Sequence, residues 1–243
     1  MITYERQVEI LNCLKRRNCA TFKELASAVY ASESSVRRDI KKLELDGYVK
    51  QTYGGVVLAS YANEIVPIKL REKENASVKD EIARSAAQYI FDGATILMDG
   101  SSTVRKITKY IDDYKNLKII TNNHLIFSGL ESNNAAIYST GGRFDRQNQI
   151  FLGSAAEEYV RNITADILFF SSQAISEEGE ITDVSEEETA LRRVMLSRAK
   201  RKIFLCDSSK VGLQKTFKLC TKDDVDLILC DQRLPWETTI VRA

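Results

Sequence analysis

The chain has 243 residues, of which 44% are hydrophobic and 28% charged, so it is long and apolar enough to form one or two folded domains. This composition excludes fibrous, collagen-like and disordered proteins. Only 2 Pro and 11 Gly leave little material for a long flexible linker, so two domains would be joined by a short connection.

The cysteines and the apolar segments indicate the cellular compartment. The cysteines are odd in number and form no CxxC pair, as expected for the reduced thiols of a cytoplasmic protein, and we expect neither a metal site nor a cofactor. The first residues carry the charges of Glu5, Arg6 and Glu9 where a signal peptide needs an apolar core. No uncharged apolar run approaches the length of a membrane span, so no membrane partner is expected.

The net charge of +1 conceals a local asymmetry. The first 60 residues hold ten basic and seven acidic residues, whereas the remainder holds 25 basic and 27 acidic ones. Four of those ten basic residues fall in the short run from Arg37 to Lys42. The potential that could attract a polyanion therefore lies in the first quarter of the chain.

Apolar residues at helical spacing predict two short helices at the start of the chain. The first ends near residue 16, and the second covers residues 22–29. Thr21 is placed to cap the second helix, and Glu24, three residues on, would complete a capping box.

A third helix is predicted after Ser32, whose hydroxyl can cap it. Its apolar stripe consists of Val36, Ile40 and Leu43. The opposite face is polar and basic, which in an isolated helix would indicate only a solvated surface. The residues of that face and its flanks are Ser34, Arg37, Arg38, Lys41 and Lys42.

The order of these elements favours a helix-turn-helix, in which the last helix enters the major groove of DNA. Gly47 then ends the helix, and the alternating residues 48–58, with a turn at Gly54 and Gly55, predict a β-hairpin wing. The wing could reach phosphates while the helix contacts base edges. The predicted DNA-binding residues are Thr21, Ser34, Ser35, Arg37, Arg38, Lys41, Lys42, Lys50, Gln51 and Tyr53.

The run from Glu24 to Leu58 resembles the winged helix of the DeoR family of bacterial transcriptional regulators. Ser35 stands where the family usually has Thr, and Gln51 and Tyr53 replace the more usual Arg and His, which makes this wing less cationic. The positions that match the family pattern are Ser32, Val36, Arg37, Arg38, Asp39, Leu43, Gly47, Gly54 and Gly55.

The rest of the chain alternates amphipathic helices with nearly continuous apolar runs. Such runs predict the strands of a mostly parallel, Rossmann-like sheet that is covered on both faces. A ligand of such a sheet lies at the carboxyl ends of the strands. The predicted strands are residues 95–99, 117–122, 135–140, 166–172, 202–207 and 225–231.

Small and polar residues gather directly after these strands. Backbone N–H groups, hydroxyls and one or two cations can bind a phosphate or a sugar, although any one of these loops could be an ordinary capped turn. The loops are residues 99–103, 121–123, 140–143, 153–154 and 207–210.

From about Lys79 onward the chain also resembles the DeoR effector domain, which is similar in fold to ribose-5-phosphate isomerase. The resemblance implies a sugar-phosphate pocket, with the phosphate over the turn from Ser101 to Thr103. Ser101, Ser171 and Ala174 stand where the family usually has glycine. The implied effector-binding residues are Asp99, Ser101, Ser102, Thr103, Thr121, Asn122, Gly141, Gly142, Arg143 and Lys210.

Two alternatives come from other functional classes. A sugar-phosphate isomerase needs a carboxylate base, but residues 169–174 hold no acid where the isomerases of this fold carry an acidic run. Glu177, Glu178 and Glu180 indicate a surface loop, and His124 a solvent-facing or capping residue. A redox sensor would use Cys206 and Cys230, which end two predicted strands, although buried inert thiols are the simpler interpretation.

The sequence thus predicts a DNA-binding domain at residues 1–57, a linker at 58–75 and an effector-binding and oligomerisation domain at 76–243. We expect a cytoplasmic transcriptional regulator, not an enzyme, that represses sugar-metabolism genes. Its expected partners are a double-stranded DNA operator, a phosphorylated sugar effector and further copies of the chain in a homodimer or homotetramer, since one winged helix covers few base pairs.

Overall fold

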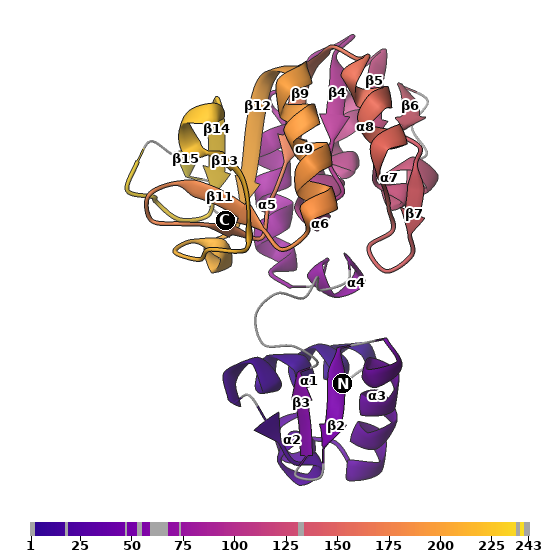
Figure 1. The fold of residues 1–243 in the computed structure, drawn as a ribbon, viewed down its shortest axis with the longest axis vertical. Coiled ribbons are helices and arrows are strands. Elements are labelled where there is room, and N and C mark those ends of the chain that lie inside the picture. The colour runs from indigo at the N-terminus through magenta and orange to yellow at the C-terminus, as the bar shows by residue number, and fades with distance from the viewer. Residues whose placement is uncertain are drawn as a thin grey trace. The chain divides into compact units, whose positions relative to one another are not determined.

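A computed structural model describes residues 3–17, 19–46, 48–52, 55–58, 68–72, 74–130, 134–236 and 239–240 (Figure 1). The chain forms two compact units, Met1–Val66 and Pro67–Ala243. Each unit has its own buried core, and the two are described separately below.

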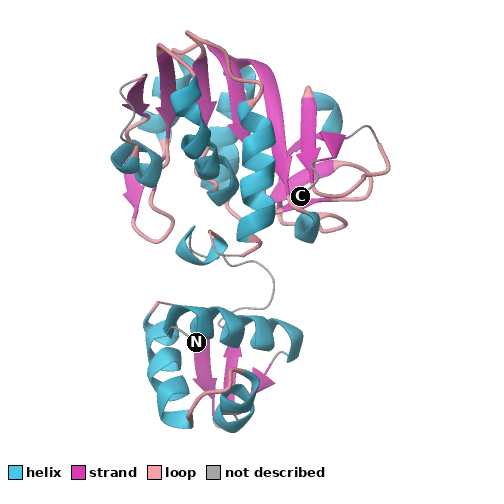
Figure 2. Ribbon diagram, turned by 180° about the vertical axis from the view of Figure 1, so that it is seen from behind, coloured by secondary structure: helices cyan, strands magenta, loops and turns pink. Residues whose placement is uncertain are grey.

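The N-terminal unit consists of three helices and a small antiparallel sheet (Figure 2). The strands follow the order β1-β3-β2, and β2 and β3 form a hairpin in which Lys50 pairs with Val57. The three predicted helices and the predicted hairpin are therefore confirmed, while Gly47, Tyr53 and Gly54 lie outside the described residues. The elements are α1 (Thr3–Arg17), β1 (Cys19–Ala20), α2 (Phe22–Ala28), α3 (Glu33–Leu45), β2 (Val49–Thr52) and β3 (Gly55–Leu58).

The predicted caps are also present in this unit. The Thr21 side chain accepts a hydrogen bond from the Glu24 amide, and the Glu24 carboxylate accepts one from the Thr21 amide, so the capping box is complete. Ser32 caps α3 by accepting from the amide of Ser35 at 3.3 Å. These bonds satisfy amides that have no partner inside their own helix, and so define where α2 and α3 begin.

The C-terminal unit is built on a seven-stranded sheet in which every neighbouring pair of strands is parallel. The strand order is β15-β14-β12-β9-β4-β5-β6, and the six predicted strands are all present. The strands are β4 (Thr95–Met98), β5 (Leu117–Thr121), β6 (Ala135–Ser139), β9 (Ala165–Phe170), β12 (Ala199–Cys206), β14 (Leu227–Cys230) and β15 (Thr239–Ile240).

Helices and two smaller sheets surround this sheet, as Figures 1 and 2 show. The helical elements are α4 (Ile68–Arg71), α5 (Ala76–Ala87), α6 (Ser102–Arg105), η1 (Lys106–Asp113), α7 (His124–Gly129), α8 (Ser154–Arg161), α9 (Glu186–Arg198), η2 (Ser208–Lys210) and η3 (Lys222–Asp224). The smaller sheets are the hairpin of β7 (Arg143–Asp145) and β8 (Ile150–Leu152), and the antiparallel trio β10 (Ala174–Ile175), β11 (Glu180–Asp183) and β13 (Phe217–Thr221).

Successive residues of each strand contribute to two separate cores. In β4, Ile96 and Met98 pack on the face covered by α5, whereas Leu97 packs on the face covered by α8 and α9. Because both faces are covered, the strands have no polar side, which explains their continuous apolar sequence. Among the described residues, no helix is long and apolar enough to cross a membrane.

The region predicted as a linker contains structure that belongs to the C-terminal unit. Residues 68–71 form α4, and Ile68 is fully buried. Arg71, the last residue of α4, donates to Asn148, and Glu72 forms an ion pair with Arg105, both within the same unit. The C-terminal unit therefore begins before residue 76.

Candidate functional site

Two polar surfaces stand out, one on each unit, and the first is the outer face of α3. Val36, Ile40 and Leu43 are buried under this helix, as its periodicity predicts. The opposite face is solvent-exposed and carries basic side chains. Its exposed members are Ser34, Arg37, Arg38, Lys41 and Lys42.

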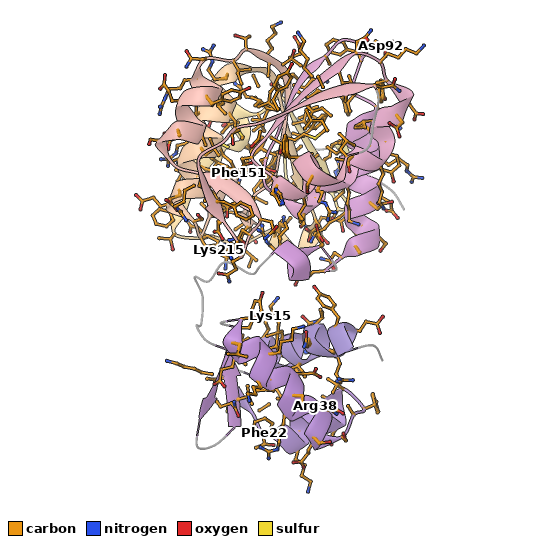
Figure 3. The ribbon with its side chains drawn as sticks, turned by 90° about the vertical axis from the view of Figure 1, so that its right-hand side faces the viewer. Lys15, Phe22, Arg38, Asp92, Phe151 and Lys215 are labelled. Carbon is orange, nitrogen blue, oxygen red and sulfur yellow. The ribbon has the colours of Figure 1, made fainter. Side chains whose placement is uncertain are left out.

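Neighbouring groups hold both arginines of this face in place. The Arg37 guanidinium lies 4.1 Å from the centroid of the Phe22 ring, and its Nη2 is 3.8 Å from the Glu33 carboxylate. Arg38 Nε donates to the carbonyl of Ser34 at 3.4 Å. In Figure 3, Phe22 and Arg38 lie at the same end of the unit. The structure thus presents two positioned guanidinium groups, the side chains best suited to guanine edges and phosphates.

The wing is attached to α3 through one of its predicted contact residues. The backbone amide of Gln51 donates to the Glu44 carboxylate at 2.8 Å, and the side-chain Nε2 of Gln51 donates to the same carboxylate at 2.5 Å. The backbone hydrogen bond holds the pKa of Glu44 below its usual value. Lys50, next to it on β2, is exposed. Lys50 is thus available to a phosphate, while Gln51 connects the wing to α3.

Other polar residues of this unit have structural roles. Thr21 and Ser35, both predicted DNA contacts, take part in the caps of α2 and α3. Asp39 is buried and forms an ion pair with Arg6 of α1, which ties α3 to the rest of the unit. The sequence contained a sign of this contact, because Asp39 lies three positions after Val36 and four before Leu43 and so falls on the apolar stripe of the helix.

The second polar surface lies at the carboxyl edge of the large sheet. The chain runs from β4 through β5 to β6 on one side and returns to β9 on the other side of β4. The carboxyl ends of β4 and β9 therefore form the switch point, the place at which ligands of open α/β sheets bind. Asp99 follows β4 and Ser171 follows β9 at this position.

Asp99 is buried, and the oxygens of its carboxylate accept from protein donors. Oδ1 accepts from the amide of Ser101 at 3.0 Å, and Oδ2 from the amide of Ser171 at 3.2 Å. Oδ2 also accepts from Nε of Arg192 at 2.8 Å. In the structure Asp99 therefore organises the loops at the switch point.

Arg192, on α9, is the centre of a buried ion cluster that the sequence analysis did not identify. Its guanidinium donates to Asp99, to Asp183 at 2.9 Å and to Glu188 at 2.6 Å, and all four side chains are at most 4% exposed. Burial raises the pKa of Glu188 despite the attraction of Arg192. Burial also opposes the charge of Arg192, but the carboxylates outweigh it and raise the pKa of this side chain.

Several predicted effector residues are buried around this switch point. Ser101 caps α6, and Thr121 accepts from the amide of Asn123 at 3.0 Å. Asn122 donates to the carbonyl of Phe151 at 3.2 Å. Among the described residues, Oγ1 of Thr103 and Oδ1 of Asn122 are buried without a hydrogen-bond partner, as a ligand-binding group would be before its ligand arrives. Ser102, also predicted, is buried in α6.

The segment from Gly141 to Arg143 is less buried than these residues. Gly142 has φ 103°, and a β-carbon there would lie 2.5 Å from the carbonyl oxygen of Leu152, so close backbone packing requires this glycine. Gly141 has open space around it. Arg143 is exposed and paired with Glu187.

Cations from distant parts of the chain meet at the same edge. Lys210 Nζ donates to Oγ of Ser171 at 3.0 Å and lies 3.7 Å from Asp207. Lys79 of α5 is buried and donates to the carbonyl of Arg71 at 2.5 Å, and burial together with repulsion from Lys210 lowers its pKa to about 8. Arg71 has a buried Nε with no partner among the described residues.

Lys210 was predicted from the sequence, whereas Lys79 and Arg71 were not. Lys79 lies on the apolar stripe of α5 with Ile82, Ala83 and Ala86. A lysine on such a stripe indicates a buried cation, and this pattern could have identified it from the sequence. No sequence pattern indicated Arg71, because it lies in the short helix α4, within the residues predicted to be the linker.

Arg71, Glu72 and Asn75 contact the loops of this edge. Arg71 donates to Asn148 at 3.1 Å, and Glu72 pairs with Arg105. Asn75 donates to Asp207 at 3.0 Å and to Ser209 at 3.2 Å. Figure 1 shows α4 at this end of the strands, and Asp92, which precedes β4, lies at the opposite end in Figure 3. The segment that leads into the unit is thus bonded to the predicted pocket.

His124 starts α7, but Asn123 supplies the cap of that helix. The His124 ring is half-buried, with its centroid 5.2 Å from that of Phe144 and 6.2 Å from that of Phe151. The capping role considered for His124 therefore belongs to its neighbour.

The N-terminal unit, three helices with a two-stranded wing, is a winged helix-turn-helix domain. The C-terminal unit is a parallel α/β domain with polar residues at its switch point, the arrangement in which such folds bind ligands. Residues 6–62 match the DeoR-like helix-turn-helix domain, and residues 74–232 match the DeoR C-terminal sensor domain. The chain belongs to the DeoR family of transcriptional regulators.

Named relatives agree with this membership. The transcriptional repressor GlcR of Bacillus subtilis is 31% identical over 97% of this chain and 90% of its own length. The transcriptional regulator GolR of Listeria innocua is 29% identical over 96% of this chain and 92% of its own length. A solved ribose-5-phosphate isomerase is 13% identical, with a TM-score of 0.42 over 56% of this chain and 54% of that one.

Proposed function

We propose that this DeoR-family regulator is a cytoplasmic repressor of sugar-metabolism genes whose DNA affinity is set by a phosphorylated sugar. The positively charged outer face of α3 supports binding of the operator by the N-terminal unit. The observation that carries the effector part is the set of cations and unpartnered buried polar atoms at the carboxyl edge of the large sheet.

In this proposal Lys210, Lys79 and Arg71 bind the phosphate. The first two are ammonium groups whose mutual repulsion a bound dianion would relieve, and Arg71 has a buried Nε–H to donate. Asn122 and Thr103 would bind sugar hydroxyls through their unpartnered oxygens. Asp99 and Arg192 hold the loops in place without contacting the ligand.

The proposed route from effector to DNA is the segment that contains Arg71. A phosphate that attracts Arg71 and Lys79 competes with the bonds these residues make to Asn148 and to the α4 carbonyl. Because α4 directly follows the connection to the N-terminal unit, a change in its position would alter how two DNA-binding units are presented. A usable switch needs about 1 to 3 kcal/mol of coupling.

The test is a thermal-shift screen of the purified protein with a panel of sugar phosphates. A ligand at about 100 times its dissociation constant should add about 2.7 kcal/mol to the stability of the folded state. Lys210→Ala should reduce the response at least several-fold, because it removes a charge-assisted hydrogen bond of about 1.5 to 3 kcal/mol.

Lys200→Ala is the matched control, since Lys200 is an ion-paired lysine near the start of the same strand, β12. It should leave the response intact. If Lys210→Ala responds as wild type does, the proposed pocket is wrong at this edge, and if no sugar phosphate changes the melting temperature or operator affinity, the effector class is wrong.

A further inference from the structure

Two cysteines occupy adjacent positions at the carboxyl ends of two neighbouring strands. Cys206 is the last residue of β12, Cys230 is the last residue of β14, and the two are direct partners in the register of this parallel pair. Both are fully buried in the same core, on the face covered by α8 and α9. Their side chains therefore extend from the same side of the sheet.

The spacing of neighbouring strands is compatible with a disulfide between these two positions. Neighbouring strands lie about 4.8 Å apart, which falls within the range of about 4.4 to 6.8 Å between the α-carbons of disulfide-bonded cysteines. The Cys206 thiol donates to the carbonyl of Asp207 at 3.4 Å, and the Cys230 thiol donates to the Asp231 carboxylate at 3.7 Å. The interaction between the two thiols raises the pKa of Cys206 and lowers the pKa of Cys230. One thiol of the pair is therefore the better nucleophile, and the other can supply a proton.

The loop that carries Lys210 starts at this pair. Asp207 follows Cys206, and Asp231 follows Cys230. The amide and hydroxyl of Ser208 donate to Asp231 at 2.6 Å and 2.8 Å, so residues next to the two cysteines already join the two strand ends. A covalent bond between Cys206 and Cys230 would act at the base of the loop from Asp207 to Lys210.

We propose that Cys206 and Cys230 form a reversible dithiol–disulfide site that is oxidised by a peroxide and changes the loop from Asp207 to Lys210. The Cys230 thiolate attacks one oxygen of hydrogen peroxide, the O–O bond breaks, and hydroxide leaves to give a sulfenic acid. The Cys206 sulfur then attacks the Cys230 sulfur and loses its proton, so that the S–S bond forms and water leaves. Two thiol groups are oxidised, and one peroxide is reduced.

The oxidant reaches this buried pair through local opening of the edge of the sheet. On its outer side β14 is covered by β15, and in the part of the chain that the structure describes only two residue pairs join these strands. Short peripheral strands open at a lower cost than the centre of a sheet, so β14 is exposed more often than β4 or β9. Oxidation is consequently slower than that of an exposed thiol and faster than that of a thiol in the centre of the sheet.

The remaining cysteines provide matched controls. Cys220 is buried in the same core but pairs in register with Ile181, and burial raises the pKa of its thiol to about 12. Cys19 is exposed in the N-terminal unit and would oxidise first, so it serves as a positive control in the wild-type chain and is replaced by serine in the test background.

The experiment treats full-length Cys19→Ser protein with hydrogen peroxide, blocks free thiols with N-ethylmaleimide and measures intact mass and peptide maps. Relative to untreated protein blocked in the same way, we expect the loss of the two N-ethylmaleimide adducts of this pair together with about 2 Da, and a Cys206–Cys230 cross-linked peptide, all reversed when dithiothreitol is added before the blocking step. Cys220→Ser should keep the cross-link, whereas Cys206→Ser and Cys230→Ser should each lose it. Hydrogen exchange at the amides of Ser208, Lys210 and Val211 should change at least about threefold on oxidation.

Other results would overturn the proposal. Absence of the mass loss after prolonged treatment with excess peroxide, well beyond the time that fully oxidises Cys19 of the wild type, or a cross-link that involves Cys220, excludes the pair as a redox site. A cross-link that leaves exchange in the loop unchanged excludes its effect on the loop. None of these measurements uses a sugar phosphate, so the outcome does not depend on the effector proposal.

Discussion

Arg37 and Arg38 differ in their contacts, although both lie on the exposed face of α3. If their guanidinium groups read guanine edges, Arg37→Ala or Arg38→Ala should weaken specific binding by about 1 to 3 kcal/mol and relax the preference at one base pair. Lys50→Ala should weaken binding to all sequences similarly, because a lysine on the wing contacts phosphate. Titrations of operator and scrambled DNA, followed by fluorescence anisotropy, measure both effects.

The comparison of the three variants is the control. Equal losses on operator and scrambled DNA for all of them would show that α3 binds only phosphates, which contradicts a base-reading role for the arginines.

If the proposed effector contacts Lys79, its binding should depend on pH. The pKa of Lys79 in the folded chain is lowered to about 8, below its ordinary value in an unfolded chain. Between these two values the unfolded chain binds more protons, so the unfavourable contribution of Lys79 to stability is present below pH 8 and decreases as the pH rises. An anion that contacts the ammonium group raises this pKa and takes up a proton on binding.

Affinity for the phosphorylated sugar should therefore fall as the pH rises through about 8. Calorimetry in buffers of different ionisation enthalpy measures the proton uptake. The charges that act on the pKa of Lys79, besides its burial, are those of Lys210, Asp207, Glu74 and Arg71. Lys79→Met should remove the pH dependence in this range, and a variant that retains it would show that another group titrates.

At the scale of elements, the cap of α3 is a separate determinant of the DNA-binding surface. Ser32→Ala removes the acceptor for the Ser35 amide and should cost about 1 kcal/mol, seen as a lower melting temperature of the N-terminal unit. Ser27→Ala, at an exposed position of α2, is the control and should have little effect. If both variants melt alike, the hydrogen bond from Ser35 contributes nothing to the start of α3.

The elements were predictable because their signals are local. The apolar runs of β4, β5, β9 and β12 and the stripe of α3 follow from periods of two and 3.6 residues, or from burial on both faces. The short strands β10, β11, β13 and β15 and the hairpin of β7 and β8 were not predicted. Strands of two to five residues, some of them with only one paired edge, carry too few apolar positions to stand out from loops.

For the whole molecule, the expected homodimer or homotetramer predicts an operator with two half-sites. A single α3 and wing cover only a few base pairs, so protection of two half-sites spaced by about one helical turn or its multiples is expected in footprinting. The logarithm of affinity should fall by about 0.9 per neutralised phosphate with the logarithm of salt concentration.

Analytical ultracentrifugation with and without operator measures the assembly directly. A monomer that protects a single half-site would contradict the expected oligomer, and affinity independent of salt would contradict phosphate binding.

The sequence by itself determined the two-part organisation, the capped helices, the parallel sheet and the polar loops, because caps, periodicity and family motifs are properties of neighbouring residues. Only the tertiary structure showed that Arg192 joins Asp99, Asp183 and Glu188, that Arg71 and Lys79 meet Lys210 at one edge, and that Cys206 and Cys230 are in register. These contacts join residues that are far apart in the sequence, such as Asp99 and Arg192 at 93 positions, and the order of strands in the sheet decides which of them meet. Local patterns carry no information on that order, so charged residues on apolar stripes acquire their roles only in the folded chain.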